Sequence, residues 1–157
     1  MRAFLLRVST LVLLLSALSF PAWSPARADE MTCPEPTPVT IDIKPGSNQN
    51  RIKLSSFGVV PVAVLTTPDF DASQFLPEMA HLTDAANAMT TGCTGAMAVR
   101  WVLEDANKDG KLDLVFYFYT QDLDLTPSST AATLMAHGSY GGTTLHIMGT
   151  DSVMVVP

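Results

Sequence analysis

Cysteine is scarce in this chain of 157 residues, which contains only Cys33 and Cys93. Two cysteines allow at most one disulfide, and neither has a His or Cys at metal-ligand spacing, so they do not make a metal site by themselves. A bridge between them would close a loop of about 60 residues and stabilise the fold by about 4 kcal/mol on the chain-entropy model. Two free thiols are the alternative.

Long apolar runs and basic residues are also few. The run from Val8 to Phe20 is short for a membrane span, follows Arg2 and Arg7, and precedes the small-x-small sequence at 26–28. This pattern predicts a removed secretory signal at 1–28, with no cysteine placed for lipid attachment. We therefore expect the mature chain to be secreted or periplasmic, with no membrane span.

Acidic residues outnumber basic ones, 15 Asp and Glu against 9 Lys and Arg. Removal of residues 1–28 would take three arginines and no acid, leaving 6 basic residues and a net charge near −9. Such a charge disfavours nucleic acid as a partner and favours divalent cations.

The motifs of common hydrolases are missing. There is no G-x-S-x-G around the nearest serine candidate, Ser139, and no H-E-x-x-H among His81, His137 and His146. A glycine-rich turn between strands accounts for the Ser139 passage without chemistry. A metal could use histidines only if folding brings His137 and His146 together.

Pairs of acids could serve a glycosidase, because that reaction uses two carboxyl groups. Asp69 with Asp71, and Asp122 with Asp124, have this spacing. Solvated acids in turns are the commoner case. We therefore predict no catalytic residues and no enzymatic activity.

The remaining pattern predicts a Pro-rich leader at 29–38 and one domain at 39–157, of a size that can bury a core. Short alternating segments separated by turn residues, without alternating helices, indicate a mainly antiparallel β-sandwich, immunoglobulin-like in general architecture. One short helix is expected at Pro77–Met89, a hairpin turn at Gly141–Gly142, and Trp101 in the core. The expected strands are Val39–Ile43, Ile52–Leu54, Gly58–Thr66, Ala98–Leu103, Leu112–Thr120, Ala131–Ala136, Thr143–Met148 and Ser152–Val156.

Residues 105–113 read D-x-N-x-D-G-x-x-D, which places oxygen-bearing side chains at alternate positions before a glycine. Ca²⁺ takes six to eight oxygen ligands, and short loops supply them in this way. The predicted ligands are the side chains of Asp105, Asn107 and Asp109, the backbone oxygen of Lys111, and Asp113 directly or through water.

The acidic loop could also be a plain turn between strands, because Asp, Asn and Gly favour turns for local backbone reasons. An EF-hand is disfavoured, because its twelfth position falls on Phe116 instead of Glu, and the residues after the loop alternate as in a strand. On that strand Tyr117 and Tyr119 would point outward if Phe116 and Phe118 face the core, and they could form an aromatic ligand surface for sugars.

Several passages together resemble a recurrent module of secreted bacterial proteins, known by its IDIKPGS start and without an assigned activity. They are IDIKPGS at 41–47, GVVPVAVLTT at 58–67, DFDA at 69–72, the acidic loop, TQD at 120–122 and GTDSVMVVP at 149–157. The resemblance implies an extracellular β-domain. In the family the loop more often has glycine where this chain has Lys108. If that position needs φ > 0, the lysine is strained and cation affinity should drop.

The sequence thus predicts a secreted, non-catalytic calcium-binding β-sandwich module with a structural or adhesive role. Its candidate partners are calcium and either a carbohydrate or a cell-surface protein. The alternative is a small extracellular hydrolase, or an accessory domain of a hydrolase, acting on polysaccharide.

Overall fold

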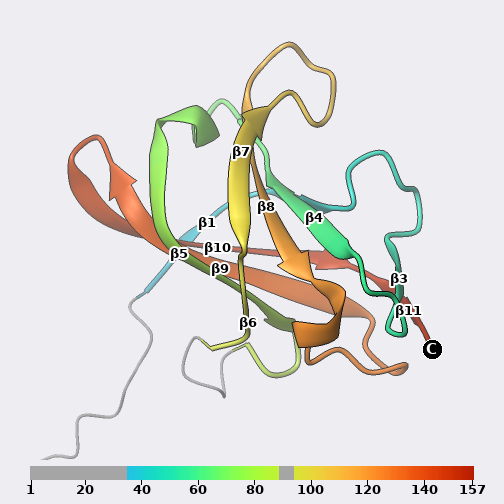
Figure 1. Cartoon of the computed structure of the whole chain (residues 1–157). Helices are drawn as coiled ribbons and strands as arrows, with labels where there is room; N and C mark the ends of the chain where they lie inside the picture. The colour runs from blue at the N-terminus through green and yellow to red at the C-terminus, as the bar shows by residue number, and fades with distance from the viewer. Residues whose placement is uncertain (1–34, 89–93) are drawn as a thin grey trace, which may run out of the picture. The chain divides into compact units, whose positions relative to one another are not determined.

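The computed structural model describes residues 35–88 and 94–157, whose regular secondary structure is almost entirely β-strand (Figure 1). The expected signal peptide at 1–28, most of the Pro-rich leader, Cys33 and Cys93 lie outside the described residues. Within the described ranges, no helix is long and apolar enough to cross a membrane.

Two main sheets form the domain. One has five strands in the order β1-β10-β9-β5-β6, the other has four in the order β2-β4-β8-β7, and β11 and β3 make a separate pair. Neighbouring strands are antiparallel except in the pairs β1–β10 and β3–β11. The prediction of an all-β, mainly antiparallel fold is confirmed. The strands are β1 Thr37–Pro38, β2 Ile41–Ile43, β3 Arg51–Lys53, β4 Val59–Val64, β5 Phe75–Asp84, β6 Ala96–Met97, β7 Arg100–Glu104, β8 Asp113–Tyr119, β9 Ala131–Tyr140, β10 Thr143–Ser152 and β11 Met154–Val156.

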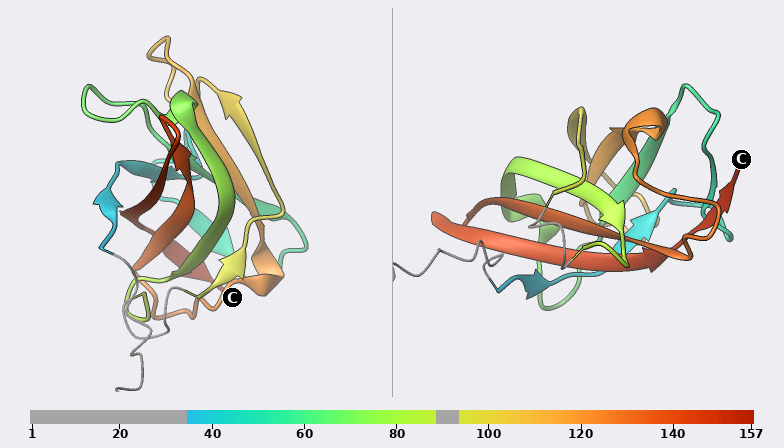
Figure 2. Two further views of the ribbon diagram at one scale, coloured as in Figure 1. Left: turned by 90° about the vertical axis from the view of Figure 1, so that its left-hand side faces the viewer. Right: turned by 90° about the horizontal axis from the view of Figure 1, so that it is seen from below.

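The core lies between the two main sheets, which face each other in the views of Figure 2. Side chains at alternate positions of each strand point into it, because successive residues of a strand face opposite sides. Full burial of each large apolar side chain contributes about 1.5–3 kcal/mol relative to exposure. The largest fully buried residues are Phe75, Phe116, Phe118, Ile43, Ile52, Leu82, Leu114, Leu134, Ile147, Val62, Val64 and Val115.

Strand β4 is a central strand, and its residues Val62, Ala63 and Val64 are fully buried. The strand predicted at Gly58–Thr66 therefore forms over Val59–Val64, and its last three residues are buried on both faces. Pro61 is tolerated because it pairs with Tyr117 on one side, while β2 ends at Ile43 on the other. The carbonyl of Pro61 accepts a hydrogen bond from the Lys44 N–H at 2.8 Å, just beyond that end.

The hairpin between β9 and β10 is also confirmed. Gly141 and Gly142 have φ values of 57° and 81°, and two successive positive values are typical of the two-residue turn that matches strand twist. Both strands are longer than predicted, and their ten residue pairs run from Thr143–Tyr140 to Ser152–Ala131.

The helix predicted at Pro77–Met89 is wrong, since Phe75–Asp84 forms strand β5. The buried residues of this strand are Phe75, Ala80, Leu82 and Thr83, and the strand pairs with β9 along its length. A β-bulge between Pro77 and Met79 shifts the register, so apolar residues fall at mixed spacings that imitate a helix. The only helical segments among the described residues are the 3₁₀ turns Ala72–Gln74 and Thr120–Asp122.

Asp151 links the first and last motifs of the domain. Its Oδ2 accepts hydrogen bonds from the N–H of Ile43 and from Asn50 Nδ2, both at 2.9 Å. Asp42 lies nearby, and burial, followed by the negative charge of Asp151, raises the pKa of Asp42 above its usual value. The IDIKPGS and GTDSV passages are thus adjacent in the fold.

Candidate metal centre

The acidic loop connects β7 to β8, as expected, and projects from one end of the four-stranded sheet (Figure 1). Two of its residues have a left-handed backbone, Lys108 with φ 64° and Gly110 with φ 86°. Glycine adopts this conformation without a steric cost, whereas lysine does not. The positive φ that was in question at Lys108 is therefore present.

The loop side chains turn back onto the loop's own amides. The N–H of Asp109 donates to Asp105 Oδ1 and to Asn107 Oδ1, both at 3.0 Å, and the N–H of Gly110 donates to Asp105 Oδ2 at 3.0 Å. The N–H of Lys111 donates to Asp109 Oδ1 at 2.9 Å. Oxygens of the first two predicted ligands therefore converge on a single amide.

Asp113 behaves differently from the other predicted ligands, because it is fully buried at the base of the loop. Its Oδ1 accepts from the Thr66 N–H at 2.8 Å, and its Oδ2 accepts from the Ala106 N–H at 3.0 Å. Thr66 Oγ1 in turn donates to the carbonyl of Leu112 at 2.6 Å. Asp113 thus fastens both ends of the loop to the chain segment that follows β4.

Local hydrogen bonds and charges favour the ionised form of Asp109. The hydrogen bond from the Lys111 N–H lowers the pKa of Asp109, and the Asn107 side chain and the Lys111 charge act in the same direction. Hydrogen bonds to the charged form of a carboxylate favour that form. Asp109 therefore carries a full negative charge at neutral pH.

The donor set of the loop suits a hard cation. It comprises the carboxylates of Asp105 and Asp109, the amide oxygen of Asn107 and the carbonyl of Lys111, all of them oxygens. A carboxylate oxygen has two lone pairs, so the hydrogen bonds within the loop leave acceptor capacity. No three His, Cys, Asp or Glu side chains in the described part of the chain are grouped to hold a metal, so water would have to complete the shell.

Folding does bring His137 and His146 together, as cross-strand partners with ring centroids 5.7 Å apart. His137 Nε2 lies 3.8 Å from a carboxylate oxygen of Glu78. His81 is elsewhere, with its Nδ1 3.3 Å from the Gly95 carbonyl. Ser139 lies in strand β9, whereas the glycine-rich turn itself comprises only the two residues after that strand.

In each acid pair considered for a glycosidase, one carboxylate is exposed to solvent and the other accepts hydrogen bonds from nearby residues. Asp71 caps a 3₁₀ turn by accepting from the Ser73 N–H, and Asp124 accepts from Thr83 Oγ1 at 2.7 Å and from a β5 amide. Asp69 and Asp122 are exposed. In each pair, one carboxylate is committed to a structural contact.

The tyrosines of β8 point outward, as expected, while Phe116 and Phe118 are buried. Tyr119 is 50% exposed. The ring of Tyr117 is covered by the guanidinium of Arg100, whose Cζ lies 3.6 Å from the ring centroid. A sugar could stack on that ring only after displacing the arginine.

Two contacts of the loop and strand were missed by sequence reasoning. Thr66 is 47 positions from Asp113, and no local pattern indicates such a pairing. The Arg100–Tyr117 contact depends on register between β7 and β8, although alternation places both residues on one sheet face.

Comparison of the chain with protein-family models, curated proteins and solved structures gave no match.

Proposed function

We propose that this chain is a secreted, non-catalytic module that binds Ca²⁺ in the loop 105–113 and has a structural or adhesive role. The observation that carries the proposal is the convergence of Asp105 and Asn107 oxygens on the amide of Asp109, in a loop whose predicted ligand atoms are all oxygens. Asp105, Asn107, Asp109 and the carbonyl of Lys111 would hold the ion. Asp113 would orient the loop from its base.

Charge repulsion gives the ion a physical role. Two unit charges about 4 Å apart repel by about 4 kcal/mol at an effective dielectric near 20. A divalent cation among the loop oxygens removes this repulsion. The acidic excess of the chain favours cation binding in the same way.

The contacts of Asp113 would transmit the effect of the ion to the sheet. Its hydrogen bonds join the loop to Thr66, immediately beyond β4, and β4 pairs with β8. A cation that orders the loop thus holds the ends of three neighbouring strands in place. For a site with a dissociation constant of about 1 mM, about 10 mM Ca²⁺ would stabilise folding by about 1.4 kcal/mol.

Thermal melting of the processed protein, with Ca²⁺ and with chelator, tests this proposal. The informative variant is Asp109→Asn, which keeps an oxygen acceptor for the Lys111 N–H but loses the charge. Asp122→Asn is the matched control, since that acid is exposed beyond the opposite end of β8. We expect Ca²⁺ to raise the melting temperature of the wild type and of Asp122→Asn but not of Asp109→Asn. Equal shifts, or no shift, in all three proteins would contradict the proposal.

The polysaccharide-directed alternative predicts different results. It requires glycan binding through the outer face of β8 or turnover of a glycan substrate. A glycan array and an activity screen with the processed protein separate the two functions. We expect no turnover, and turnover that is lost with Asp71→Asn or Asp124→Asn would favour the alternative.

A further inference from the structure

Strand β7 leaves one edge of the four-stranded sheet open. It is the last strand of its sheet, paired only with β8 among the described strands. The facing edge strand of the other sheet, β6, has only two residues and pairs with His81 and Leu82 of β5. Residues 77–80 of β5 and the first two residues of β7 border an opening between the sheets.

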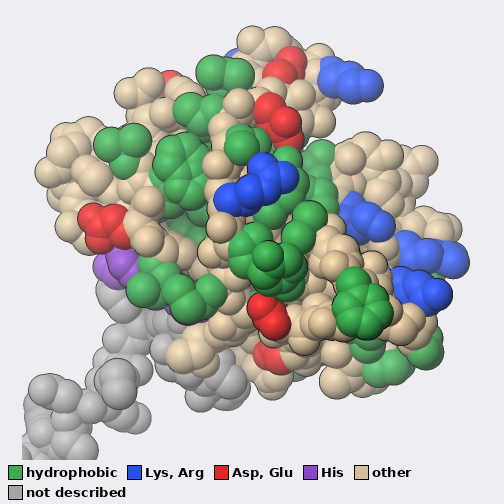
Figure 3. Space-filling view, viewed as in Figure 1, with side chains coloured by type: hydrophobic (Ala, Val, Ile, Leu, Met, Phe, Trp, Pro, Cys, Tyr) green, Lys and Arg blue, Asp and Glu red, His purple; other side chains and the backbone are tan. Residues whose placement is uncertain are grey.

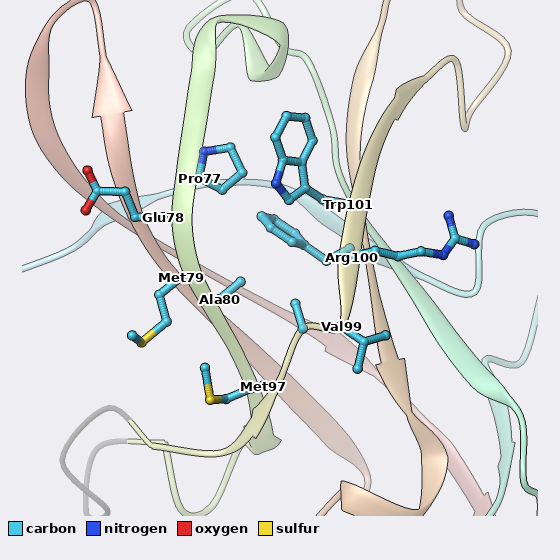
Figure 4. Close-up of a pocket in the computed structure, with 10 residues that line it drawn as sticks. Pro77, Glu78, Met79, Ala80, Met97, Val99, Arg100 and Trp101 are labelled. Atoms are coloured by element: carbon cyan, nitrogen blue, oxygen red, sulfur yellow. The ribbon is translucent and has the colours of Figure 1, made fainter.

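This opening is a cavity of about 390 Å³, lined by β5, by β6 and by residues of β7 (Figure 4). Figure 4 shows Trp101 directed toward Pro77 across the opening, while Arg100 points away from it on the other side of β7. Trp101 pairs with Phe116, a core residue, and so faces the core side of the sheet. It is nevertheless 43% exposed. The prediction that Trp101 is buried is wrong, because its side chain lies in this opening at the edge of the core.

Leu103 also faces the core side of the sheet, because it pairs with the buried Leu114, and it is 40% exposed. Val99, just before the strand, is 43% exposed. Apolar side chains gather on this face around β5 and β7 in Figure 3. The open edge thus carries core-facing apolar side chains that are only partly buried, and an exposed edge strand of this kind favours pairing with another strand.

The sequence of β7, Arg-Trp-Val-Leu-Glu, is complementary to itself in the antiparallel direction. If two copies pair about a two-fold axis through Val102, Arg100 of each copy lies opposite Glu104 of the other. Trp101 then lies opposite Leu103 on the core-facing side. Directly opposite residues on one sheet face interact, favourably for unlike charges and for aromatic–aliphatic pairs, and a two-fold axis repeats each contact.

We propose that β7 is a self-association edge, through which two copies of this chain join their four-stranded sheets into one continuous sheet. The charge match of Arg100 with Glu104 selects a second copy over an unrelated strand. Each copy would also cover the exposed Trp101 and Leu103 of the other. Because the strand has only five residues, the contact is small, and the dimer should be weak and dependent on concentration. This inference does not rest on calcium binding.

Sedimentation equilibrium of the processed protein tests the proposal, at concentrations from about 1 µM to about 1 mM, a range that brackets weak association. We expect a monomer–dimer equilibrium for the wild type. Arg100→Glu puts like charges opposite each other in both pairs and should weaken the dimer about tenfold or more. The double variant Arg100→Glu with Glu104→Arg restores opposite charges and should recover most of the wild-type affinity.

Two controls separate self-association at this edge from general effects of charge and of folding. Lys53→Glu makes the same charge change on the distant strand β3 and should leave the dimer unchanged. Thermal melting of each variant at about 1 µM reports whether the monomer is folded, and Leu103→Lys offers a second route to a monomer by charging the edge. A wild-type monomer throughout the range would overturn the proposal. So would a dimer that is indifferent to Arg100→Glu and Leu103→Lys, or a monomer that binds extended peptides at this edge instead.

Discussion

The buried carboxylate of Asp113 accepts a hydrogen bond from the backbone N–H of Thr66 at 2.8 Å, across 47 positions of sequence. Its second oxygen accepts the N–H of Ala106. Both oxygens of one side chain are therefore acceptors, and the two amides come from different segments. These two hydrogen bonds anchor the base of the acidic loop to the segment that follows β4.

Replacing Asp113 with asparagine should destabilise the protein by about 2 kcal/mol, because an amide group supplies one acceptor oxygen and sets its NH₂ against the other N–H. Chemical denaturation in chelator measures this change without any contribution from a cation. Asp122→Asn should stay within about 0.5 kcal/mol of wild type, as expected for an exposed residue. A similar small effect for Asp113→Asn would show that the base of the loop does not depend on the carboxylate.

Lys108→Gly should stabilise the protein by about 1 kcal/mol, because residue 108 has a φ of 64° that penalises a side chain with a Cβ. Lys108→Ala removes the same charge but keeps the Cβ, so it should give no comparable gain. Denaturant midpoints of the two variants distinguish backbone strain from electrostatics. Equal gains would identify the lysine charge as the cause.

The Lys108→Gly variant should also bind Ca²⁺ more tightly, because its loop is better prepared for the bound conformation.

Asp42 makes stability depend on pH in a definite direction. Its pKa is raised in the folded protein, so the folded state holds its proton more tightly, and stability falls as pH rises from the unfolded pKa through the folded one. Asp42→Asn should therefore stabilise the protein at pH 7 by less than about 1 kcal/mol, because this half-buried group is partly screened by solvent. The gain should vanish below about pH 3.9, the ordinary pKa of the group. Denaturation at several pH values measures it, and a gain of equal size at low pH would assign the effect to something other than ionisation.

Local signals predicted the parts of this fold that short segments determine. Gly141 and Gly142 form the expected turn because only residues tolerant of positive φ fit there. The loop at 105–113 lies between two strands as predicted, since its Asp and Asn side chains cap the amides of their own turn. Strand alternation places Phe116 and Phe118 on one face of β8, and this apolar face packs into the core.

Long-range pairing decided the parts that were not predicted. Strand β5 is a strand because β9 lies beside it, and its bulge after Pro77 hides the alternation from any local pattern. Trp101 has the side chain and the facing of a core residue, but its burial depends on whether another strand lies over it. Thr66 shows no sign of contact with Asp113 in the sequence. Such features depend on partners dozens of residues away.

The measurement that tests the central claim most directly is isothermal titration of Ca²⁺ into metal-free, processed wild-type protein, with Asp109→Asn and Asp122→Asn beside it. We predict one binding site that saturates at millimolar Ca²⁺, with a dissociation constant of about 10⁻⁴ to 10⁻³ M. Binding should disappear with Asp109→Asn and persist with Asp122→Asn. Heats no larger than dilution for the wild type, or equal binding by Asp109→Asn, would contradict the assignment of a calcium site to this loop.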